Sequence, residues 1–157
     1  IEFSSGEIIF NDKTILSGEF NVNMQTIQNN DISSEKYKGY LVNHLKSEDF
    51  FNVDSFPYAQ LVILEHLDIA DNNKELAFNA IIRCNLTIKR ITHQIDIPVI
   101  LNVYNNHATA SGTIDIDRTL YNIKYKSKSF FPDIGDKLIY NHFTLNFTIS
   151  VNRQWKN

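Results

Sequence analysis

The sequence of 157 residues is poor in cysteine and glycine, and these two shortages exclude several classes of protein. Its single cysteine, Cys84, excludes an intrachain disulfide framework and any cysteine-rich zinc or iron–sulfur site. None of the five glycines stands in GxGxxG or GxxxxGK[ST] spacing, so the common phosphate-binding loops are absent. We therefore expect neither a nucleotide-binding enzyme nor a thiolate metal centre.

An excess of positive charge and long apolar runs are also missing. Fifteen Lys and Arg residues stand against 18 Asp and Glu, which gives a net charge of −3. A nucleic-acid-binding domain needs a basic face, so nucleic acid is not an expected partner, and this balance gives no polybasic signal for an anionic membrane surface. No run approaches the roughly 18 apolar residues of a membrane-spanning helix, so we expect a protein that does not span the membrane.

The composition that remains is that of an ordinary globular domain. Apolar residues make up 43% of the chain and charged residues 21%, which argues against disorder. The length favours one domain, and no internal repeat, low-complexity tract or linker divides the chain. We expect residues 1–157 to form a single domain.

Strands are predicted wherever apolar and polar residues alternate, because successive side chains of a strand point to opposite faces. The alternation runs over 76–88, 95–103, 108–117 and 139–151, and more briefly over 20–25, while 61–69 is apolar on both faces. Short polar turns at 11–13, 71–74 and 105–107 separate these runs and make neighbouring strands antiparallel. The pattern predicts six or seven antiparallel strands.

One helix interrupts the strands. Apolar and aromatic residues recur at helical spacing at Tyr37, Tyr40, Leu41, His44 and Leu45, which predicts a helix over 35–46. Ser33 or Ser34 can cap its start. Long strands with one apolar face, joined in sequence, suit an up-and-down barrel better than a sandwich. The predicted fold is therefore all-β, an antiparallel up-and-down barrel with one α-helix covering an end or a side.

No catalytic or metal-binding constellation is evident in the sequence. The five histidines are scattered without the spacing of a metal pair, and His44 is expected to pack between the helix and the barrel. Asp115 and Asp117 alternate with isoleucines and so face outward, while Arg118 is expected to be structural, bonded near Asp117. Cys84 falls on an apolar face, where a thiol is usually inert. We predict no catalytic residue, no metal and no cofactor.

Two aromatic pairs and several small residues on the inward faces indicate an apolar cavity. Phe50-Phe51 and Phe130-Phe131 either plug one end of the barrel or frame the mouth of the cavity. Small residues such as Ala108 and Gly112 either leave room inside or let neighbouring elements pack closely. The residues expected to line the ligand site are apolar and lie on inward faces or at the mouth: Phe20, Met24, Phe50, Phe51, Phe78, Ala80, Ile82, Ala110, Ile114, Phe130, Phe143 and Phe147.

Four motifs, in the same order along nearly the whole chain, carry a resemblance to a known family. They are His44-Leu45-Lys46-Ser47 with Asp49-Phe50-Phe51-Asn52-Val53 and Phe56-Pro57; Leu86-Thr87-Ile88-Lys89 with Thr92; Asp117-Arg118-Thr119 with Ile123-Lys124-Tyr125; and Ser129-Phe130-Phe131 with Ile134-Gly135-Asp136-Lys137. With these motifs the chain resembles the YceI-like family of bacterial lipid-binding proteins.

The chain also departs from the family pattern. Cys84 and Arg90 stand where the family commonly has glycines, and Asn122 replaces another usual glycine. Asparagine tolerates the left-handed backbone conformation that such a position can require. The family's first strand has no counterpart here, so we expect that strand to be missing ahead of Ile1. An open sheet edge would then lie beside Glu7–Phe10 or Phe143–Val151, and a homodimer through that edge is an expected partner state.

The resemblance implies a function and a location. It implies a lipocalin-like barrel that binds and carries a long isoprenoid lipid, either a polyisoprenoid or an isoprenoid quinone, without chemistry. Two alternatives stay open: an enzyme that acts on an isoprenoid or polyene with His44 or Asp49 as proton donor, and a solid barrel that serves as an interaction module. Family members are usually exported, so the expected location is the periplasm, with the cytoplasm as the alternative.

Overall fold

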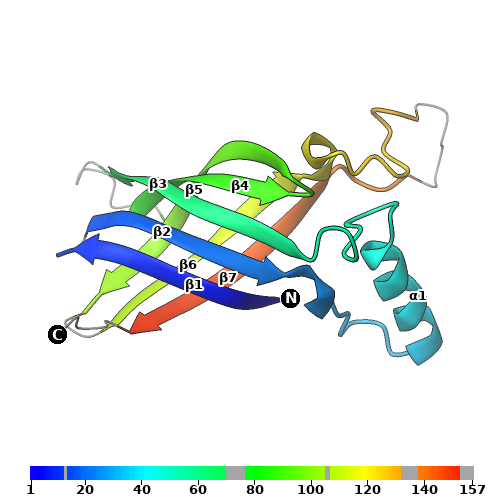
Figure 1. The fold of residues 1–157 in the computed structure, drawn as a ribbon, viewed down its shortest axis with the longest axis horizontal. Coiled ribbons are helices and arrows are strands. Elements are labelled where there is room, and N and C mark those ends of the chain that lie inside the picture. Colours follow the sequence, from blue (N-terminus) through cyan, green and yellow to red (C-terminus); the bar gives the residue numbers. More distant parts are fainter. Residues whose placement is uncertain (13, 70–76, 105–106, 132–137, 153–157) are drawn as a thin grey trace.

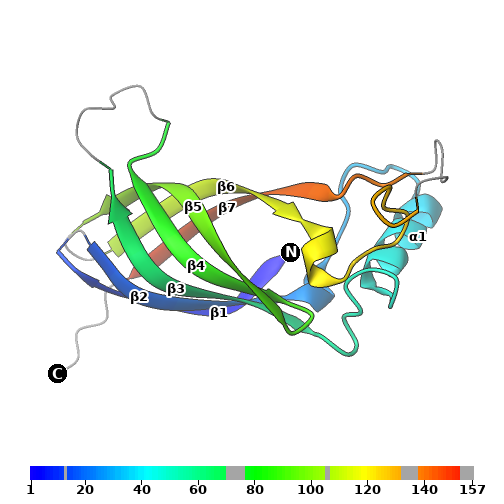
Figure 2. The ribbon, with the colours of Figure 1, turned by 90° about the horizontal axis from the view of Figure 1, so that it is seen from above.

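The computed structural model describes residues 1–12, 14–69, 77–104, 107–131 and 138–152. Seven antiparallel strands form one strongly curled sheet in which every strand pairs with its neighbour in sequence (Figures 1 and 2). The strands are β1 (Glu2–Asn11), β2 (Thr14–Asn23), β3 (Tyr58–Asp68), β4 (Ala80–Ile88), β5 (Ile91–Val103), β6 (His107–Asp117) and β7 (His142–Asn152). The predicted all-β, lipocalin-like fold with one helix is confirmed.

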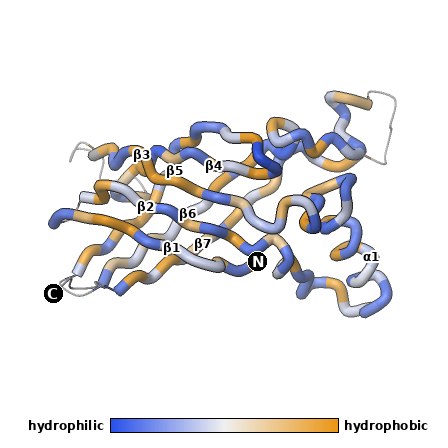
Figure 3. Tube along the Cα trace, in the orientation of Figure 1, coloured by the Kyte–Doolittle hydropathy of each residue, from blue (hydrophilic) through white to orange (hydrophobic). Residues whose placement is uncertain are grey.

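The alternation of the sequence sets the two faces of the sheet, as the colouring along the strands in Figure 3 shows. In β4 the residues at even positions, from Ala80 to Ile88, are buried and the residues between them are half-buried. β4 begins at Ala80, whereas the sequence predicted a strand from Leu76. Phe78 and Asn79 precede the strand, and Leu76 lies outside the described residues.

The connections of the sheet fall alternately at its two ends, because each strand runs opposite to the one before it. The connections β2–β3, β4–β5 and β6–β7 lie at the end that also carries helix α1 (Glu35–Lys46), which we call the helix end (Figure 1). The 3₁₀ helices η1 (Met24–Thr26) and η2 (Arg118–Tyr121) lie in two of these connections. The connections β1–β2, β3–β4 and β5–β6 form the opposite end.

Helix α1 has the predicted bounds and extends beyond the strand ends rather than lying along the sheet (Figure 2). Ser34 occupies the N-cap position, as predicted, but its side chain makes no capping hydrogen bond. Leu45 packs against the core, while Tyr37 and Tyr40 are exposed. Among the described residues, no helix is both long and apolar enough to cross a membrane.

Positive backbone φ angles occur at Arg90 and Asn122, two of the three positions at which glycine is expected from the family resemblance, whereas the third, Cys84, lies within β4. Lys89 and Arg90 form the two-residue turn between β4 and β5 with φ values of 51° and 63°, as a type I′ turn requires. Asn122 ends η2 in the left-handed conformation with φ 59°, so the predicted tolerance of asparagine at this position is confirmed.

Candidate functional site

The inner face of the curled sheet holds two clusters of buried apolar side chains. The first lies toward the helix end and includes Met24, Phe50, Tyr121 and Ile123. The second lies farther from the helix end on the inner face and includes Phe20, Ala80, Ile82 and Cys84. Leu61, Ile95 and Ile114 contact both clusters, so the two are continuous along the sheet.

Most of the residues predicted to line the ligand site meet on this inner face. Those in the first cluster or packed against it are Met24, Phe50, Phe51, Ile114 and Phe143. Those in the second cluster or packed against it are Phe20, Ala80, Ile82, Ile114 and Phe147, while Ala110 lines a small cavity beside it. The sequence therefore selected the correct face of each strand, although no contact with a ligand follows from this.

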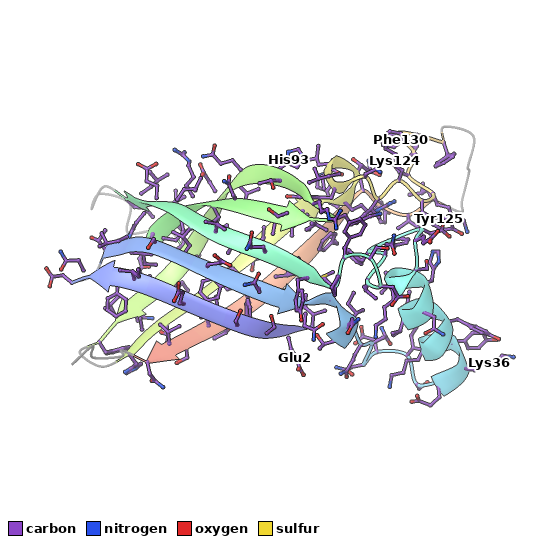
Figure 4. All side chains as sticks on the ribbon, viewed as in Figure 1. Glu2, Lys36, His93, Lys124, Tyr125 and Phe130 are labelled. Atoms are coloured by element: carbon purple, nitrogen blue, oxygen red, sulfur yellow. The ribbon has the colours of Figure 1, made fainter. Side chains whose placement is uncertain are left out.

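Phe78 and Phe130 lie outside both clusters. Phe78 is half-buried in the segment just before β4. Phe130 is exposed in the β6–β7 connection, where the ammonium group of Lys124 lies 4.7 Å from its ring centre (Figure 4). Phe130 therefore belongs to the outer surface of the helix end.

A pocket on the inner face is very small and partly open. It measures about 10 Å³, room for about one water molecule, and is lined by Ile8, Phe10, Leu101, Ala110 and Ile149 among others. At Gly112 a side chain would meet the Pro98 carbonyl oxygen at 2.7 Å and the Phe147 ring at 2.9 Å. Gly112 therefore lets neighbouring strands pack closely, rather than leaving room for a ligand.

A larger hollow of about 390 Å³ lies at the opposite end but has a polar lining. Thr14, His66, Asn79, Asn102 and Tyr104 contribute to it. The His66 ring also accepts a hydrogen bond from the Ile15 amide at 3.0 Å. Because polar groups dominate its wall, this hollow does not suit a long apolar chain.

The inner face is uncovered where the two outermost strands end the sheet. The order β1 to β7 contains no pairing between β1 and β7 among the described residues. Every inward side chain of β7 is only half-buried: Phe143, Leu145, Phe147, Ile149 and Val151. On β1, Phe3 packs on Phe20 with ring centres 5.7 Å apart and still leaves 47% of its surface exposed. We call this strip of half-buried apolar side chains on β1 and β7 the β1–β7 seam.

The helix end, by contrast, is closed by aromatic side chains. The His44 ring lies 4.6 Å from Tyr125 and 5.1 Å from Phe50 between ring centres, and Phe51 lies 6.1 Å from Phe143. Phe50 is buried, so the first aromatic pair plugs this end of the sheet. His44 packs against the loop after α1 and the β6–β7 connection, so it is held at the predicted edge of the helix, although its ring contacts are with these connections rather than with the sheet itself.

Arg118 fixes the connection that follows β6, and it is only 3% exposed. Its guanidinium donates hydrogen bonds to the carbonyl oxygens of Ile123 at 2.7 Å, Ile139 at 2.9 Å and Tyr140 at 2.9 Å. Burial lowers the pKa of this guanidinium, although the charge of Asp117 opposes the shift. The predicted structural role is supported by this geometry, but the bonded partners are backbone carbonyls rather than the Asp117 carboxylate.

Asp117 instead caps η2. Its carboxylate accepts hydrogen bonds from the Thr119 amide at 2.9 Å and the Thr119 hydroxyl at 2.7 Å. Burial acts to raise the pKa of this carboxyl, but the hydrogen bonds from Thr119 and the nearby charges of His142 and Arg118 outweigh it and lower the pKa. Asp115, also predicted to face outward, is exposed.

Cys84 is completely buried in the centre of the sheet, and burial raises the pKa of its thiol to about 12. A thiol with this pKa is a poor nucleophile at neutral pH. Across the described part of the chain, no three His, Cys, Asp or Glu side chains come together in a way that could hold a metal ion.

Sequence reasoning missed several members of the seam and one buried anchor. Phe3, Leu145, Ile149 and Val151 belong to the uncovered inner face, and the alternation along β7 could have indicated the last three. Ser127, with no exposed surface, donates a hydrogen bond from its hydroxyl to the Asn141 side-chain oxygen at 2.7 Å. No sequence pattern pointed to that serine.

Comparison with known proteins decides the family. The YceI-like domain model matches residues 1–151. The chain belongs to the YceI-like domain family. No curated protein sequence matches the chain.

Solved structures with the same fold extend over nearly the whole YceI-like chain. BcnA of Burkholderia cenocepacia is similar with a TM-score of 0.69 and 18% identity, covering 96% of this chain and 84% of its own. A Campylobacter jejuni YceI protein has a TM-score of 0.68 and 13% identity, with 98% and 84% covered. A polyisoprenoid binding domain from Saccharophagus degradans, implicated in plant cell wall breakdown, has a TM-score of 0.59 and 10% identity, with 94% and 82% covered. At these identities the likeness establishes the fold.

Proposed function

We propose that this YceI-like protein binds and carries a long isoprenoid lipid, a polyisoprenoid or an isoprenoid quinone, without changing it chemically. The lipid lies along the inner face of the sheet and covers the β1–β7 seam. The observation that carries the proposal is the row of half-buried apolar side chains on β7, together with Phe3 of β1, which is 47% exposed.

The energetics of burial favour an apolar occupant for this seam. Each square ångström of apolar surface removed from water contributes about 25 cal/mol. The five inward side chains of β7 are all partly exposed. An extended apolar ligand lying along the strand therefore buries apolar surface at every second residue. A linear hydrocarbon with repeated branches matches such a strip better than a compact ligand, which would need an enclosed cavity far larger than the pocket of about 10 Å³.

Family membership adds support for an isoprenoid. The similar fold of the Saccharophagus degradans domain is described as polyisoprenoid binding. The chain also shares the YceI-like domain over residues 1–151. Both observations favour an isoprenoid over other apolar ligands.

The chemistry of the described side chains favours carriage over catalysis. His44 packs against two aromatic rings, Arg118 uses its donors on backbone carbonyls, and Cys84 is a buried thiol with a raised pKa. Asp49, the other candidate proton donor, is exposed in the loop after α1. An acid catalyst of a polyene reaction needs a proton donor that faces the bound substrate. None of these four groups presents such a proton donor to the inner face.

Mass spectrometry of an organic extract of the purified protein tests the proposal. We expect an intact prenyl lipid in near-stoichiometric amount. A chemically altered product would favour the enzyme. A lipid-free protein that sediments as a dimer would assign the seam to a second copy of the chain, and a lipid-free monomer would favour the solid interaction module.

A matched pair of substitutions on β6 locates the lipid. Ala110 is half-buried and pairs with Ile149 of the seam, whereas Ala108, two residues away on the same face, is buried. We expect Ala110→Phe to fill lipid space, remove the extractable lipid and leave the free energy of unfolding nearly unchanged. We expect Ala108→Phe to overpack the core and cost about 1–3 kcal/mol. Equal destabilisation by both, with lipid retained in Ala110→Phe, would contradict the site.

A further inference from the structure

The β6–β7 connection, residues 118–141, exposes an unusual number of large apolar side chains at the helix end. Phe131 is 50% exposed and Tyr140 is 82% exposed. The exposed large apolar residues of this connection are Leu120, Phe130, Phe131, Leu138 and Tyr140. An exposed group of this kind is typical of a surface that meets a partner.

The same connection is basic in a chain that is acidic as a whole. Residues 118–141 contain five basic and two acidic residues, and the stretch 118–131 contains no acidic residue. Lys124 and Lys126 place their ammonium groups 4.7 Å and 5.1 Å from the ring centres of Phe130 and Tyr125. Lys128, also exposed, is the third lysine of this stretch. The net charge of −3 conceals this local excess, which is why the whole-chain balance gave no polybasic signal.

Buried polar anchors hold the exposed aromatic residues in place. The Phe130 and Phe131 amides donate hydrogen bonds to the Ser127 carbonyl at 3.1 and 2.9 Å. The Ser127 hydroxyl bonds to Asn141, and the Asn141 side-chain amide donates to the Ser129 hydroxyl at 2.9 Å. The rings are thus presented on a fixed turn, which lowers the entropic cost of binding a partner.

Charge at the helix end is divided between two sides. Figure 4 shows Lys124 and Phe130 together on the β6–β7 connection, with α1 and its Lys36 on the other side of Tyr125. The stretch 31–54, on and around α1, has five acidic residues against three lysines: Asp31, Glu35, Glu48, Asp49 and Asp54, with Lys36, Lys38 and Lys46. An anionic partner is therefore favoured by the β6–β7 connection and disfavoured by the α1 side.

We propose that the segment 124–131, together with Tyr140, docks onto an anionic lipid bilayer. Aromatic rings are favoured at the boundary between headgroups and acyl chains, and lysines beside them bind anionic headgroups. Docking here turns the helix end toward the bilayer. The inference rests on the proposed function for its purpose, because a carrier of an isoprenoid must exchange its cargo with a membrane, but the docking can be measured without any cargo.

Flotation of the protein with lipid vesicles tests the docking. We expect binding to vesicles of phosphatidylcholine with phosphatidylglycerol, weaker binding to phosphatidylcholine alone, and loss of the difference at high salt. A lysine near an anionic surface contributes about a fivefold gain in partition, so K124Q/K126Q/K128Q should weaken binding to anionic vesicles by roughly a hundredfold. F130S/F131S should weaken binding to both kinds of vesicle by about tenfold or more.

A variant at the opposite end of the molecule provides the matched control. Leu16 and Tyr104 are exposed to a similar degree as Phe130 and Phe131 but lie at the opposite end of the sheet. We expect L16S/Y104S to bind vesicles like the unchanged protein. Equal loss in this control, or an unchanged protein that ignores anionic vesicles, would overturn the docking proposal.

The lipid extract separates this inference from the proposed function. Extractable isoprenoid in a protein that does not float with anionic vesicles would overturn the docking alone. Vesicle binding by a protein that never contains or takes up an isoprenoid would support the docking and overturn the carriage. Thermal unfolding of each variant tests whether misfolding is the cause; the substituted side chains are exposed, apart from the half-buried Lys126.

Discussion

Strands β4 and β7 have the same alternating sequence pattern and differ in what covers their inward faces. The inward residues of β4, from Ala80 to Ile88, are all buried, whereas those of β7, from Phe143 to Val151, are all half-buried. β4 has a hydrogen-bonded neighbour on each side, while β7 pairs with β6 alone among the described strands. Alternation therefore reveals which face turns inward, and the neighbouring strands decide whether that face is covered.

The helix end shows a third arrangement. There the inner face is closed by aromatic packing around His44, Phe50 and Tyr125. The guanidinium carbon of Arg118 lies 5.4 Å from the centre of the Phe50 ring, and its hydrogen bonds hold the β6–β7 connection. The uncovered part of the inner face thus runs along the outer strands.

The largest expected effect tests the closed end. Arg118→Ala removes three hydrogen bonds from a buried guanidinium and leaves the carbonyl groups of residues 123, 139 and 140 without these donors. We expect the free energy of unfolding to fall by about 3–5 kcal/mol, measured by chemical denaturation. The lipid-to-protein ratio of the folded fraction should not change, because Arg118 contacts the plug rather than the seam.

Arg83→Ala is the control for a charged side chain at the surface. Arg83 pairs with Asp96 at 2.8 Å and with Glu65 at 3.3 Å on the outer face, and ion pairs in water contribute little to stability. We expect a much smaller loss than in Arg118→Ala. Lost lipid binding in a well-folded Arg118 variant would instead make the helix end part of the ligand site.

The next effect compares equal substitutions on the covered and uncovered faces. Ile82 of β4 is buried and Ile149 of β7 is half-buried, and both point inward. We expect Ile82→Ala to cost about 2–5 kcal/mol and Ile149→Ala less than half as much in lipid-free protein. In lipid-loaded protein the cost of Ile149→Ala should rise, because the ligand then covers this side chain.

Denaturant unfolding of each variant, in lipid-free and in lipid-loaded protein, gives the four free energies of unfolding to compare with the unchanged protein. An Ile149 variant whose cost is the same with and without lipid would show that the ligand does not lie against β7. An Ile149 variant as destabilised as the Ile82 variant in lipid-free protein would show that the seam is covered by other means.

The sequence predicted the faces of the strands and the helix because both depend on local periodicity. The helix over 35–46 and the inward positions of Ile82 and Phe147 follow from spacing alone. The seam depends on which strands pair, and among the described strands β1 and β7 do not pair. The expectation of an open edge beside Glu7–Phe10 or Phe143–Val151 came from the family resemblance, because the alternation within β1 or β7 does not indicate which strand lies next to it. The partners of Arg118 were also beyond local reasoning, because two of its three carbonyl groups lie 21 and 22 residues away.

The exposed position of Phe130 illustrates the same limit. The motif around Phe130-Phe131 indicated a function at the barrel mouth, but only the fold shows that Phe130 faces outward beside Lys124. The local positive charge of residues 118–131 could not be recognised for a similar reason. The net charge of −3 adds up residues that lie on different sides of the helix end in the folded protein.

The last prediction compares thiols on the two faces through the pH dependence of stability, and one pH unit above the unfolded pKa its effect, about 1.4 kcal/mol, is smaller than the losses expected for Arg118→Ala and Ile82→Ala. Burial raises the pKa of Cys84 from 9.0 in the unfolded chain to about 12 in the folded protein. Between these values the unfolded state loses the thiol proton while the folded state keeps it. The contribution of Cys84 to stability is therefore complete below pH 9 and falls by about 1.4 kcal/mol for each pH unit above it, until the folded thiol also ionises near pH 12.

Cys84→Ala isolates this contribution, because Tyr and Lys side chains also titrate in the same range and their effects cancel in the difference between the two proteins. A second variant, Cys84→Ala with Ile149→Cys, moves the thiol to the half-buried seam. There we expect a thiol pKa close to its unfolded value in lipid-free protein, and so no added loss of stability above pH 9. Lipid loading should restore part of the pH dependence by covering the new thiol. Equal slopes for thiols at positions 84 and 149 in lipid-free protein would mean that β7 is as well covered as β4.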